Sequence, residues 1–502
     1  MKILLKLGIG NMSITFQTFT YMKLNFKKQV AYLSLIFLIA FLFRVYRLNL
    51  MGIDYYGDTY HHWLISYLTA KNNFIYTDFK PKTMNLVWLP LYHYLIAFLM
   101  SLTGIWNVSI LHWFNIILGS LTCMLIYILM LQISNDDYLG FFAGLSLAIQ
   151  PWFIELNVLG LTETLTVFFL ILTLIFYFRF NLHFLPVIIG LFMLTRYEAW
   201  FFSGFLVLTL LFQKKKRAFF NCFLSIILIF LIWCLWSYIN VLDPLAWFKM
   251  QKNMVEWDWI YIYGKPSLSL KRIIEYPKLI MNVTSNLFLL GLISGVLNFK
   301  KRELRLIFIL TIFYAMLLSI QFCLGKLLLH ARHTIYFFPL TSILYTHLFL
   351  NKRKNLMNKA VLLLIVLIPA ISLNSMITIK SSKSLEVKAG EALKNIYDGG
   401  FVISDSPTII YFSGIPPEKF YSTNNLFWYK NSWNKTELQN WLLNHNVKYI
   451  VWENVSYSAS WWLFPDLKEN QILKFDDITL VEIFDEKEYS LNIKIFKVIY
   501  EH

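Results

Sequence analysis

Long apolar runs dominate the chain, and short polar or basic stretches separate them. Runs such as FFLILTLIFYF at 168–178 and AVLLLIVLIPAISL at 360–373 are apolar on every face of a helix, which is typical of membrane spans. A helix of about 20 apolar residues crosses a bilayer. We therefore predict spans at 29–48, 108–133, 139–155, 162–180, 218–240, 281–299, 305–324, 334–350 and 359–379.

Two further stretches have the length of a span but are interpreted differently. Residues 86–104 follow Pro81, contain Pro90 and carry several aromatic residues, so we predict that they lie along the outer interface. As a single helix, residues 183–212 would place Arg196 near the bilayer centre, at a cost of about 2.5 kcal/mol or more. We predict instead two short helices that meet at the outer surface.

Basic clusters orient these spans. Lys and Arg gather at 213–217, 300–305 and 351–359, and the positive-inside rule places such clusters in the cytoplasm. The arrangement that satisfies them all has about eleven crossings, with the amino terminus inside and the carboxyl terminus outside. It predicts a multi-pass protein of the cell (plasma) membrane. The predicted parts are a cytoplasmic segment 1–28, a transmembrane domain 29–379 with external loops 49–107 and 241–280, and an extracytoplasmic domain 380–502.

The pattern changes after about residue 380, where periodic segments of mixed polarity replace the apolar runs. Residues 384–397 and 435–446 read as amphipathic helices. Strand-like segments, rich in β-branched and aromatic residues, occur at 400–405, 408–414, 447–454, 478–484 and 492–500. The predicted fold class is therefore an α-helical polytopic membrane protein with a C-terminal α/β domain.

Composition supports a bilayer rather than a nucleic acid as the partner. The chain is 58% hydrophobic and 15% charged, and its net charge of +16 comes from short clusters between apolar runs. The four cysteines lack the spacing of a metal or redox site.

Candidate chemistry begins at MGIDYYGDTYHHW, residues 51–63, directly after the first span. If a helix starts there, His61 and His62 lie one turn beyond Asp58. Asp58 could serve as a general base, a metal ligand or a solvated loop residue. Adjacent histidines among aromatic residues also suit simple packing.

The order of these parts resembles the GT-C superfamily of polyprenyl-phosphate-sugar-dependent glycosyltransferases, particularly protein O-mannosyltransferases and the aminoarabinose transferases of lipid A. The motifs that carry the resemblance are GDTYHHW, WLPLYHYL, QPWFIELNVLGLTETL, GLFMLTRYEAW and LHARHTIYFFP. The resemblance covers nearly the whole chain, although each motif is short.

The resemblance implies roles for individual residues. Asp58 matches the acidic residue that activates the acceptor, with Asp54 as the second choice. Thr59 and Tyr60 stand where the family often has a second acid, so the resemblance leaves a divalent metal open without indicating one. The implied ligands of the donor lipid phosphate are Arg196, Arg332 and Lys82, and the implied supporting residues are Asp54, His61, His62, Glu163, Glu198 and His333.

The predicted activity is transfer of a single sugar, such as a mannose-like hexose, with inversion from a polyprenyl or dolichyl phosphate to an external hydroxyl of a glycan, lipid or protein. The signature WWDYG of oligosaccharyltransferases is missing, since WWLFP at 461–465 keeps only its tryptophans. The alternatives are a lipid or glycan transporter or flippase, in which charges would line a path near the midplane, and a non-catalytic scaffold.

Overall fold

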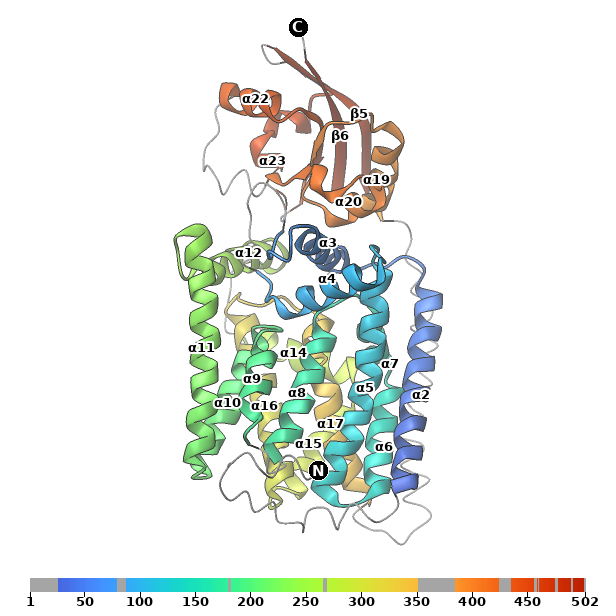
Figure 1. The fold of residues 1–502 in the computed structure, drawn as a ribbon, viewed down its shortest axis with the longest axis vertical. Coiled ribbons are helices and arrows are strands. Elements are labelled where there is room, and N and C mark those ends of the chain that lie inside the picture. Colours follow the sequence, from blue (N-terminus) through green and yellow to red (C-terminus); the bar gives the residue numbers. More distant parts are fainter. Residues whose placement is uncertain are drawn as a thin grey trace, which may run out of the picture.

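The computed structural model describes residues 26–78, 87–178, 182–264, 269–350, 384–423, 435–455, 458, 460–474, 477–488 and 491–500. A helical bundle forms one part and a domain with a mixed sheet forms the other (Figure 1). Between them, α3, α4 and α12 lie across the end of the bundle rather than along it (Figure 1). The fold class predicted from the sequence is confirmed, while the number of crossings stays a prediction.

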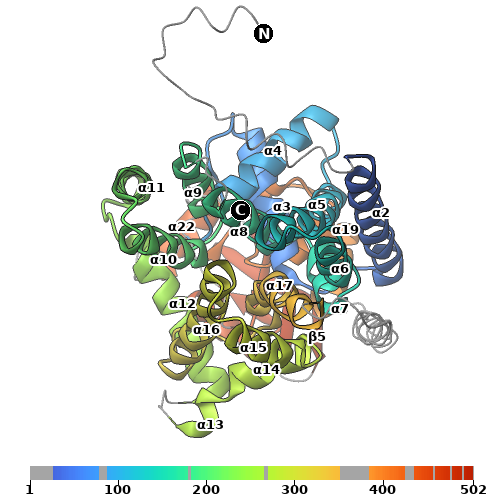
Figure 2. The same cartoon turned by 90° about the horizontal axis from the view of Figure 1, so that it is seen from below.

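The bundle contains helices of very different lengths. Figure 2 shows them end on, with α2 and α11 far apart on the rim. The elements of residues 26–350 are α2 (Phe26–Met51), α3 (Gly57–Lys71), α4 (Leu91–Thr103), α5 (Ser109–Ser134), α6 (Asp137–Ala148), α7 (Pro151–Val158), α8 (Glu163–Phe178), α9 (Leu185–Met193), α10 (Glu198–Phe212), α11 (Lys216–Val241), α12 (Ala246–Tyr263), α13 (Leu270–Ile273), α14 (Glu275–Val283), α15 (Leu287–Leu297), α16 (Arg302–Cys323), η3 (Ala331–Thr334) and α17 (Phe337–Leu350).

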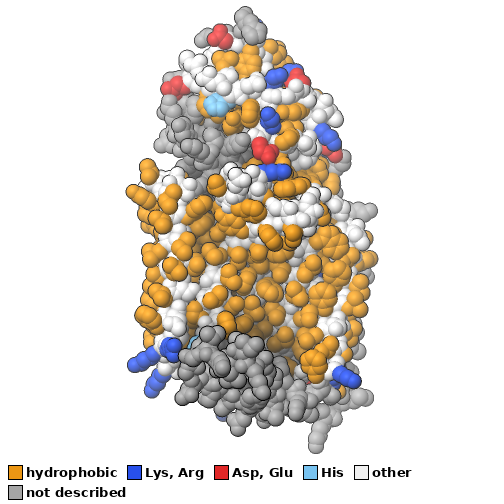
Figure 3. Space-filling view, in the orientation of Figure 1, with side chains coloured by type: hydrophobic (Ala, Val, Ile, Leu, Met, Phe, Trp, Pro, Cys, Tyr) orange, Lys and Arg blue, Asp and Glu red, His pale blue; other side chains and the backbone are white. Residues whose placement is uncertain are grey.

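Within the described residues, length and apolar composition suit four helices to crossing a membrane, namely α2, α5, α11 and α16, or six spans if two bent pairs each count as one. The face shown in Figure 3 is almost entirely hydrophobic along the bundle, with Lys and Arg at its lower end. This surface suits contact with lipid chains.

The split of residues 183–212 into two helices is confirmed, because α9 ends at Met193 and α10 begins at Glu198. Two other spans, predicted as continuous, are broken. The 139–155 span bends by 61° between α6 and α7, since Pro151 cannot continue the hydrogen-bond ladder of α6. The span predicted at 281–299 is interrupted by a 101° bend between α14 and α15, where Ser285 and Asn286 adopt positive φ. The predicted span 359–379 lies outside the described residues.

Arg44 and Arg47 of α2 are buried inside the bundle. Arg44 donates to the Asn157 side chain at 2.9 Å, and Arg47 donates to both carboxylate oxygens of Glu155 at 2.5 and 2.9 Å. An unpaired charge in this environment would be costly, so these bonds fasten α2 to α7.

The C-terminal domain has a six-stranded sheet in the order β2-β1-β3-β6-β5-β4. Strands β2, β1 and β3 run parallel, and β3, β6, β5 and β4 pair antiparallel. Its elements are α19 (Leu385–Ile396), β1 (Phe401–Ile403), α20 (Pro407–Ser413), η4 (Pro417–Lys419), β2 (Phe420–Tyr421), α22 (Lys435–Asn444), β3 (Val447–Glu453), α23 (Ser460–Leu463), η5 (Pro465–Lys468), β4 (Ile472–Lys474), β5 (Ile478–Glu488) and β6 (Leu491–Tyr500).

One predicted strand of this domain is wrong. Residues 408–414 form most of helix α20, because its capping signals outweigh the β propensity of its isoleucines. The Ser406 side chain accepts a hydrogen bond from the Ile409 backbone, Pro407 occupies the first turn and Gly414 ends the helix in the left-handed conformation.

An apolar cluster joins the bundle to the C-terminal domain. The Tyr411 ring of α20 lies 5.1 Å from the Tyr60 ring and 4.9 Å from the Trp63 ring of α3, measured between centroids. Leu385 and Ile409 belong to the same buried cluster as Trp63. Helix α3 is therefore packed on the sheet domain on one side.

A buried carboxyl group terminates β3. Glu453 has no solvent exposure, and neither of its side-chain oxygens has a hydrogen-bond partner. Burial raises the pKa of Glu453 well above its usual range, and the nearby Glu386 and Asp405 carboxylates raise it further. The folded domain therefore favours the protonated form.

We expect Glu453→Gln to stabilise the C-terminal domain at pH 7. The unfolded chain releases this proton above about pH 4.3, whereas the folded chain retains it until its raised pKa, so Glu453 lowers stability increasingly as the pH rises through that window. Hydrogen exchange of the β3 amides in the full-length protein should be slower in the variant at pH 7 and indistinguishable from wild type near pH 4. The exposed control Glu469→Gln should change neither value; a pH-independent difference for Glu453→Gln would contradict the explanation.

Candidate active site

Helix α3 lies at the end of the bundle that faces the C-terminal domain (Figure 1). Asp58 lies in the first turn of α3. A carboxylate is favoured there because unpaired backbone N–H groups give the helix amino terminus a partial positive charge. The side chain is 30% exposed, so solutes can reach it. Its carboxylate accepts a hydrogen bond from Nη1 of Arg332, which comes from the short helix η3.

Arg332 is incompletely paired. Its Nε is buried and lacks a hydrogen-bond partner, at 3.7 Å from a Glu163 oxygen. The guanidinium carbon lies 5.8 Å from the Tyr56 ring centroid and 6.0 Å from that of Trp88, so aromatic faces border the charge. Arg332 therefore keeps donor capacity for a further anion.

Arg196, in the break between α9 and α10, is fully paired by comparison. Its Nε and Nη2 donate to the two oxygens of Glu198 at 3.1 and 2.9 Å. Its Nη1 donates to the Thr162 hydroxyl at 2.9 Å and lies 2.9 Å from a Glu163 oxygen. A paired guanidinium with this many bonds is suited to holding helices together.

Glu163 and Glu198 occupy the first turns of α8 and α10. Glu163 is 1% exposed and lies against both arginines. Nδ1 of His333, next to Arg332 in the chain, lies 3.4 Å from Glu198. The site thus combines three carboxylates, two guanidinium groups and one imidazole, from Asp58, Glu163, Arg196, Glu198, Arg332 and His333.

The other residues that the sequence predicts for the site either lie apart from this charged centre or fall outside the residues that the structure describes. Asp54 turns toward His112, whose Nε2 is 3.9 Å away, and accepts from the Tyr56 backbone at 2.8 Å. His61 contacts both oxygens of Asp78 at 3.1 Å. Lys82 lies outside the described residues.

His62 is buried in a chain of polar groups. Its Nδ1 lies 3.0 Å from Nε2 of His93, and the His93 Nδ1 lies 3.0 Å from the Tyr76 hydroxyl. Burial lowers the pKa of His62 well below its usual range and that of His93 to about 3. Burial therefore favours the neutral form of both rings, and their contacts are those of packing residues.

Sequence reasoning missed several neighbours of the site. Trp88, Tyr56 and Thr162 contact the arginines. They lie within the quoted motifs, but the sequence gives no reason to pair an aromatic ring or a hydroxyl group there with an arginine. Glu155 binds Arg47 and also accepts from the Tyr55 hydroxyl at 2.8 Å, which anchors the segment leading to Asp58. The pairing of Glu155 with an arginine could have been predicted from the sequence, because a lone acid and lone arginines inside apolar spans require partners.

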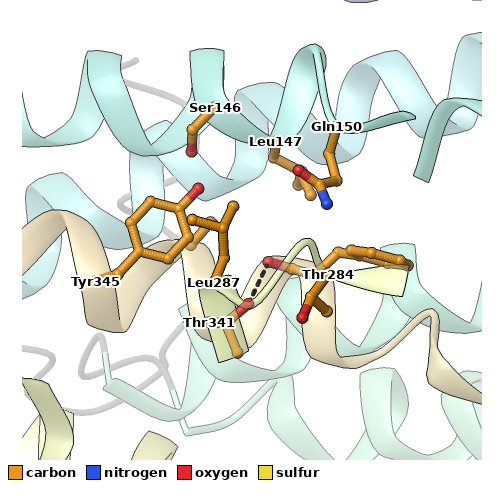
Figure 4. Close-up of a pocket in the computed structure, with 9 residues that line it drawn as sticks. Ser146, Leu147, Gln150, Thr284, Leu287, Thr341 and Tyr345 are labelled. Carbon is orange, nitrogen blue, oxygen red and sulfur yellow. Dashed lines mark hydrogen bonds between the residues drawn. The ribbon is translucent and has the colours of Figure 1, made fainter. Parts of the chain in front are cut away.

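Two small cavities lie outside this charged centre. One, of about 10 Å³, lies where the α6–α7 break faces the α14–α15 break, and Gln150 points toward Thr284 across it (Figure 4). It has room for about one water molecule. The second, of about 70 Å³, is beside Gly57, between the Asp54–Tyr60 segment and residues Ser384, Glu386 and Thr408 of the C-terminal domain.

A divalent metal finds no ready site in the part of the chain that the structure describes. Among those residues, no three His, Cys, Asp or Glu side chains are arranged so that they could hold a metal ion together. Arginines already compensate the three carboxylates of the charged centre.

Several solved structures share this architecture. An Archaeoglobus fulgidus oligosaccharyltransferase in complex with Zn and sulfate aligns with 84% of this chain and 67% of its own, at 14% identity and a TM-score of 0.56. The Archaeoglobus fulgidus oligosaccharyltransferase AglB in complex with an inhibitory peptide and a dolichol-phosphate aligns with 87% of this chain and 70% of its own, at 13% identity and a TM-score of 0.54. ArnT from Cupriavidus metallidurans bound to undecaprenyl phosphate covers 93% of this chain and 97% of its own, at 9% identity and a TM-score of 0.54.

The chain has the GT-C fold. No protein-family model matches the sequence, and neither does a curated protein. The GT-C resemblance read from the motifs is therefore confirmed at the level of the fold, and chemistry has to be argued from the site.

We expect the two arginines of this site to differ in structural importance. Arg196→Gln breaks a buried network and should destabilise the protein by about 3 kcal/mol or more. Arg332→Gln should cost less, because it removes one hydrogen-bonded pair with the partly exposed Asp58 and a longer contact with Glu163. Thermal unfolding in detergent checks this. Equal losses would contradict the assignment, and Arg196→Lys, which keeps the charge but not the paired geometry, should give an intermediate loss.

Proposed function

We propose that this protein is a membrane glycosyltransferase that moves one sugar from a polyprenyl-phosphate carrier to an acceptor hydroxyl. The observation that carries the proposal is the contact between an accessible carboxylate, Asp58, and an incompletely paired guanidinium, Arg332. A base for a hydroxyl and a cation for a phosphate thus lie side by side. The GT-C fold supports the same reaction class, since two of the similar structures hold dolichol-phosphate and undecaprenyl phosphate.

In the proposed reaction, Asp58 takes the proton of the acceptor hydroxyl as its oxygen attacks the anomeric carbon of the sugar. The bond from that carbon to the phosphate oxygen breaks, and its electron pair leaves with the polyprenyl phosphate. A single displacement inverts the anomeric carbon. Arg332 stabilises the phosphate through charge-assisted hydrogen bonds, and Lys82 is proposed from the sequence alone as a second cation.

The motif resemblance implies that Arg196 binds the donor phosphate, but we propose a structural role for it instead. Its donors bind Glu198 and Thr162, and it forms an ion pair with Glu163, so we assign it to holding the site together and Arg332 to the phosphate. His333 and Glu198 contact each other at the edge of the site, and we assign both a supporting role. The sugar, a hexose in this proposal, and the acceptor, a glycan, lipid or protein, follow from the motif resemblance.

Transfer from radiolabelled polyprenyl-phosphate sugars to a membrane extract tests the proposal. We expect Asp58→Asn to reduce transfer roughly 10²–10⁴-fold, the usual contribution of a general base, while polyprenyl-phosphate binding is retained. Asp243→Asn is the matched control, because Asp243 pairs with Lys249 far along the chain. Undiminished transfer by Asp58→Asn would remove Asp58 as the base; absence of transfer by every form would favour a transporter or a scaffold.

The proposed orientation places the amino terminus in the cytoplasm and the C-terminal domain outside. Single cysteines introduced at Lys214 and at Glu469, both exposed, should react with an impermeant maleimide from opposite sides of a sealed membrane. The native cysteines are buried, apart from the half-buried Cys234, so background labelling should be low. Labelling of both positions from one side would contradict this topology.

A further inference from the structure

The proposed base is not free in the structure. Among the described residues, Arg332 is the hydrogen-bonding partner of Asp58. A carboxylate paired to a guanidinium is a weaker base than a free one, because the positive charge stabilises its ionised form. One of its oxygens is also occupied, where an acceptor hydroxyl would have to donate. The pairing therefore opposes the reaction that we assign to Asp58.

The charges of the site make this pairing exchangeable. Three carboxylates share two guanidinium groups, and Arg196 is committed to Glu163 and Glu198 through a buried network. Arg332 is left with Asp58 and a 3.7 Å contact to Glu163. An incoming phosphate would find its best donors on Arg332, whose Nε is unused. Phosphate and Asp58 would then compete for the same guanidinium.

The surroundings of Arg332 permit such an exchange. The residue belongs to a four-residue 3-10 helix rather than to a long span, and its guanidinium is bordered by the rings of Tyr56 and Trp88. Aromatic faces attract a cation without fixing its direction as a hydrogen bond does. The Asp58 side chain is 30% exposed, so it can be solvated once its partner turns away.

We propose that the donor phosphate takes Arg332 from Asp58 and thereby frees the carboxylate for the acceptor hydroxyl. This inference rests on the proposed function. It makes Arg332 the link between donor binding and base availability: before donor binds, Asp58 is held in an ion pair, and the complete site forms once the phosphate has replaced it. Donor binding would precede productive acceptor binding.

Binding of undecaprenyl phosphate to the purified full-length protein in neutral detergent tests the exchange without any acceptor. We expect Asp58→Asn to bind this lipid roughly three- to tenfold more tightly than wild type, because the phosphate no longer displaces a carboxylate. Arg332→Gln should bind it more weakly. Asp243→Asn is the control, since it removes a carboxylate that pairs with Lys249 and not with Arg332, and should leave the affinity unchanged.

A double-variant cycle separates exchange from simple repulsion between two anions. If Asp58 acts by occupying Arg332, the gain from Asp58→Asn should largely disappear in an Arg332→Gln background. If it acts only by repulsion, the gain should be the same in both backgrounds, and that result overturns the inference. Should Arg332→Gln fail to fold, the cycle with Arg332→Lys serves, with a reduced gain expected and an unreduced gain overturning the exchange.

The outcomes also separate the inference from the proposed function. Wild-type binding with no gain in Asp58→Asn would overturn the exchange and leave a polyprenyl-phosphate enzyme standing. Failure of the wild-type protein to bind undecaprenyl phosphate would overturn both.

Discussion

The burial of the Arg196 charge is the constraint on which the arrangement of the site depends. A guanidinium 8% exposed in an apolar bundle must have its donors satisfied and its charge compensated. Glu198 and Thr162 accept its hydrogen bonds, and Glu163 adds an ion pair at 2.9 Å. These residues belong to α10, α8 and the turn before α8, so one charge fixes three segments. Glu198 in turn contacts His333 beside Arg332, which brings η3 against the amino terminus of α3.

The GT-C fold explains how residues so distant in the sequence meet. Each charged residue of the site lies at a helix end or in a helix break, where the chain leaves the apolar interior. Such ends carry unpaired backbone groups and tolerate side-chain charge better than the middle of a span. A bundle of this kind can gather chemistry at one end while its sides remain hydrophobic (Figure 3).

Much of this could be predicted from the sequence, because long apolar runs and interrupted patterns have direct physical meanings. The helical bundle, the α/β domain and the break at Arg196 follow from hydropathy and the cost of a buried charge. The bends at Pro151 and Asn286 were missed, since apolar content hides a local backbone break. Helix α20 was missed because its isoleucines suggested a strand while its caps decided the outcome.

For the site, the sequence motifs identified the charged residues but could not show which of them form ion pairs with one another. Arg196 and Arg332 look alike in the sequence, each beside a polar motif at the end of an apolar run. Their difference is geometric. Arg196 forms ion pairs with acids from two helices, whereas Arg332 donates to one carboxylate and its Nε, 3.7 Å from Glu163, has no hydrogen-bond partner. Such pairings between distant segments are set by the tertiary fold, which a single sequence does not reveal.

The contact between α3 and α20 has a consequence for how the protein is made. Tyr60 and Trp63 are covered by Tyr411, which is synthesised long after α3 has left the ribosome. Until then, the aromatic face of the helix that carries Asp58 lacks the contacts that Tyr411 supplies. The finished arrangement around Asp58 is therefore completed by the last part of the chain, and a product that stops short of α20 carries the residues of the site without the surface that holds them in place.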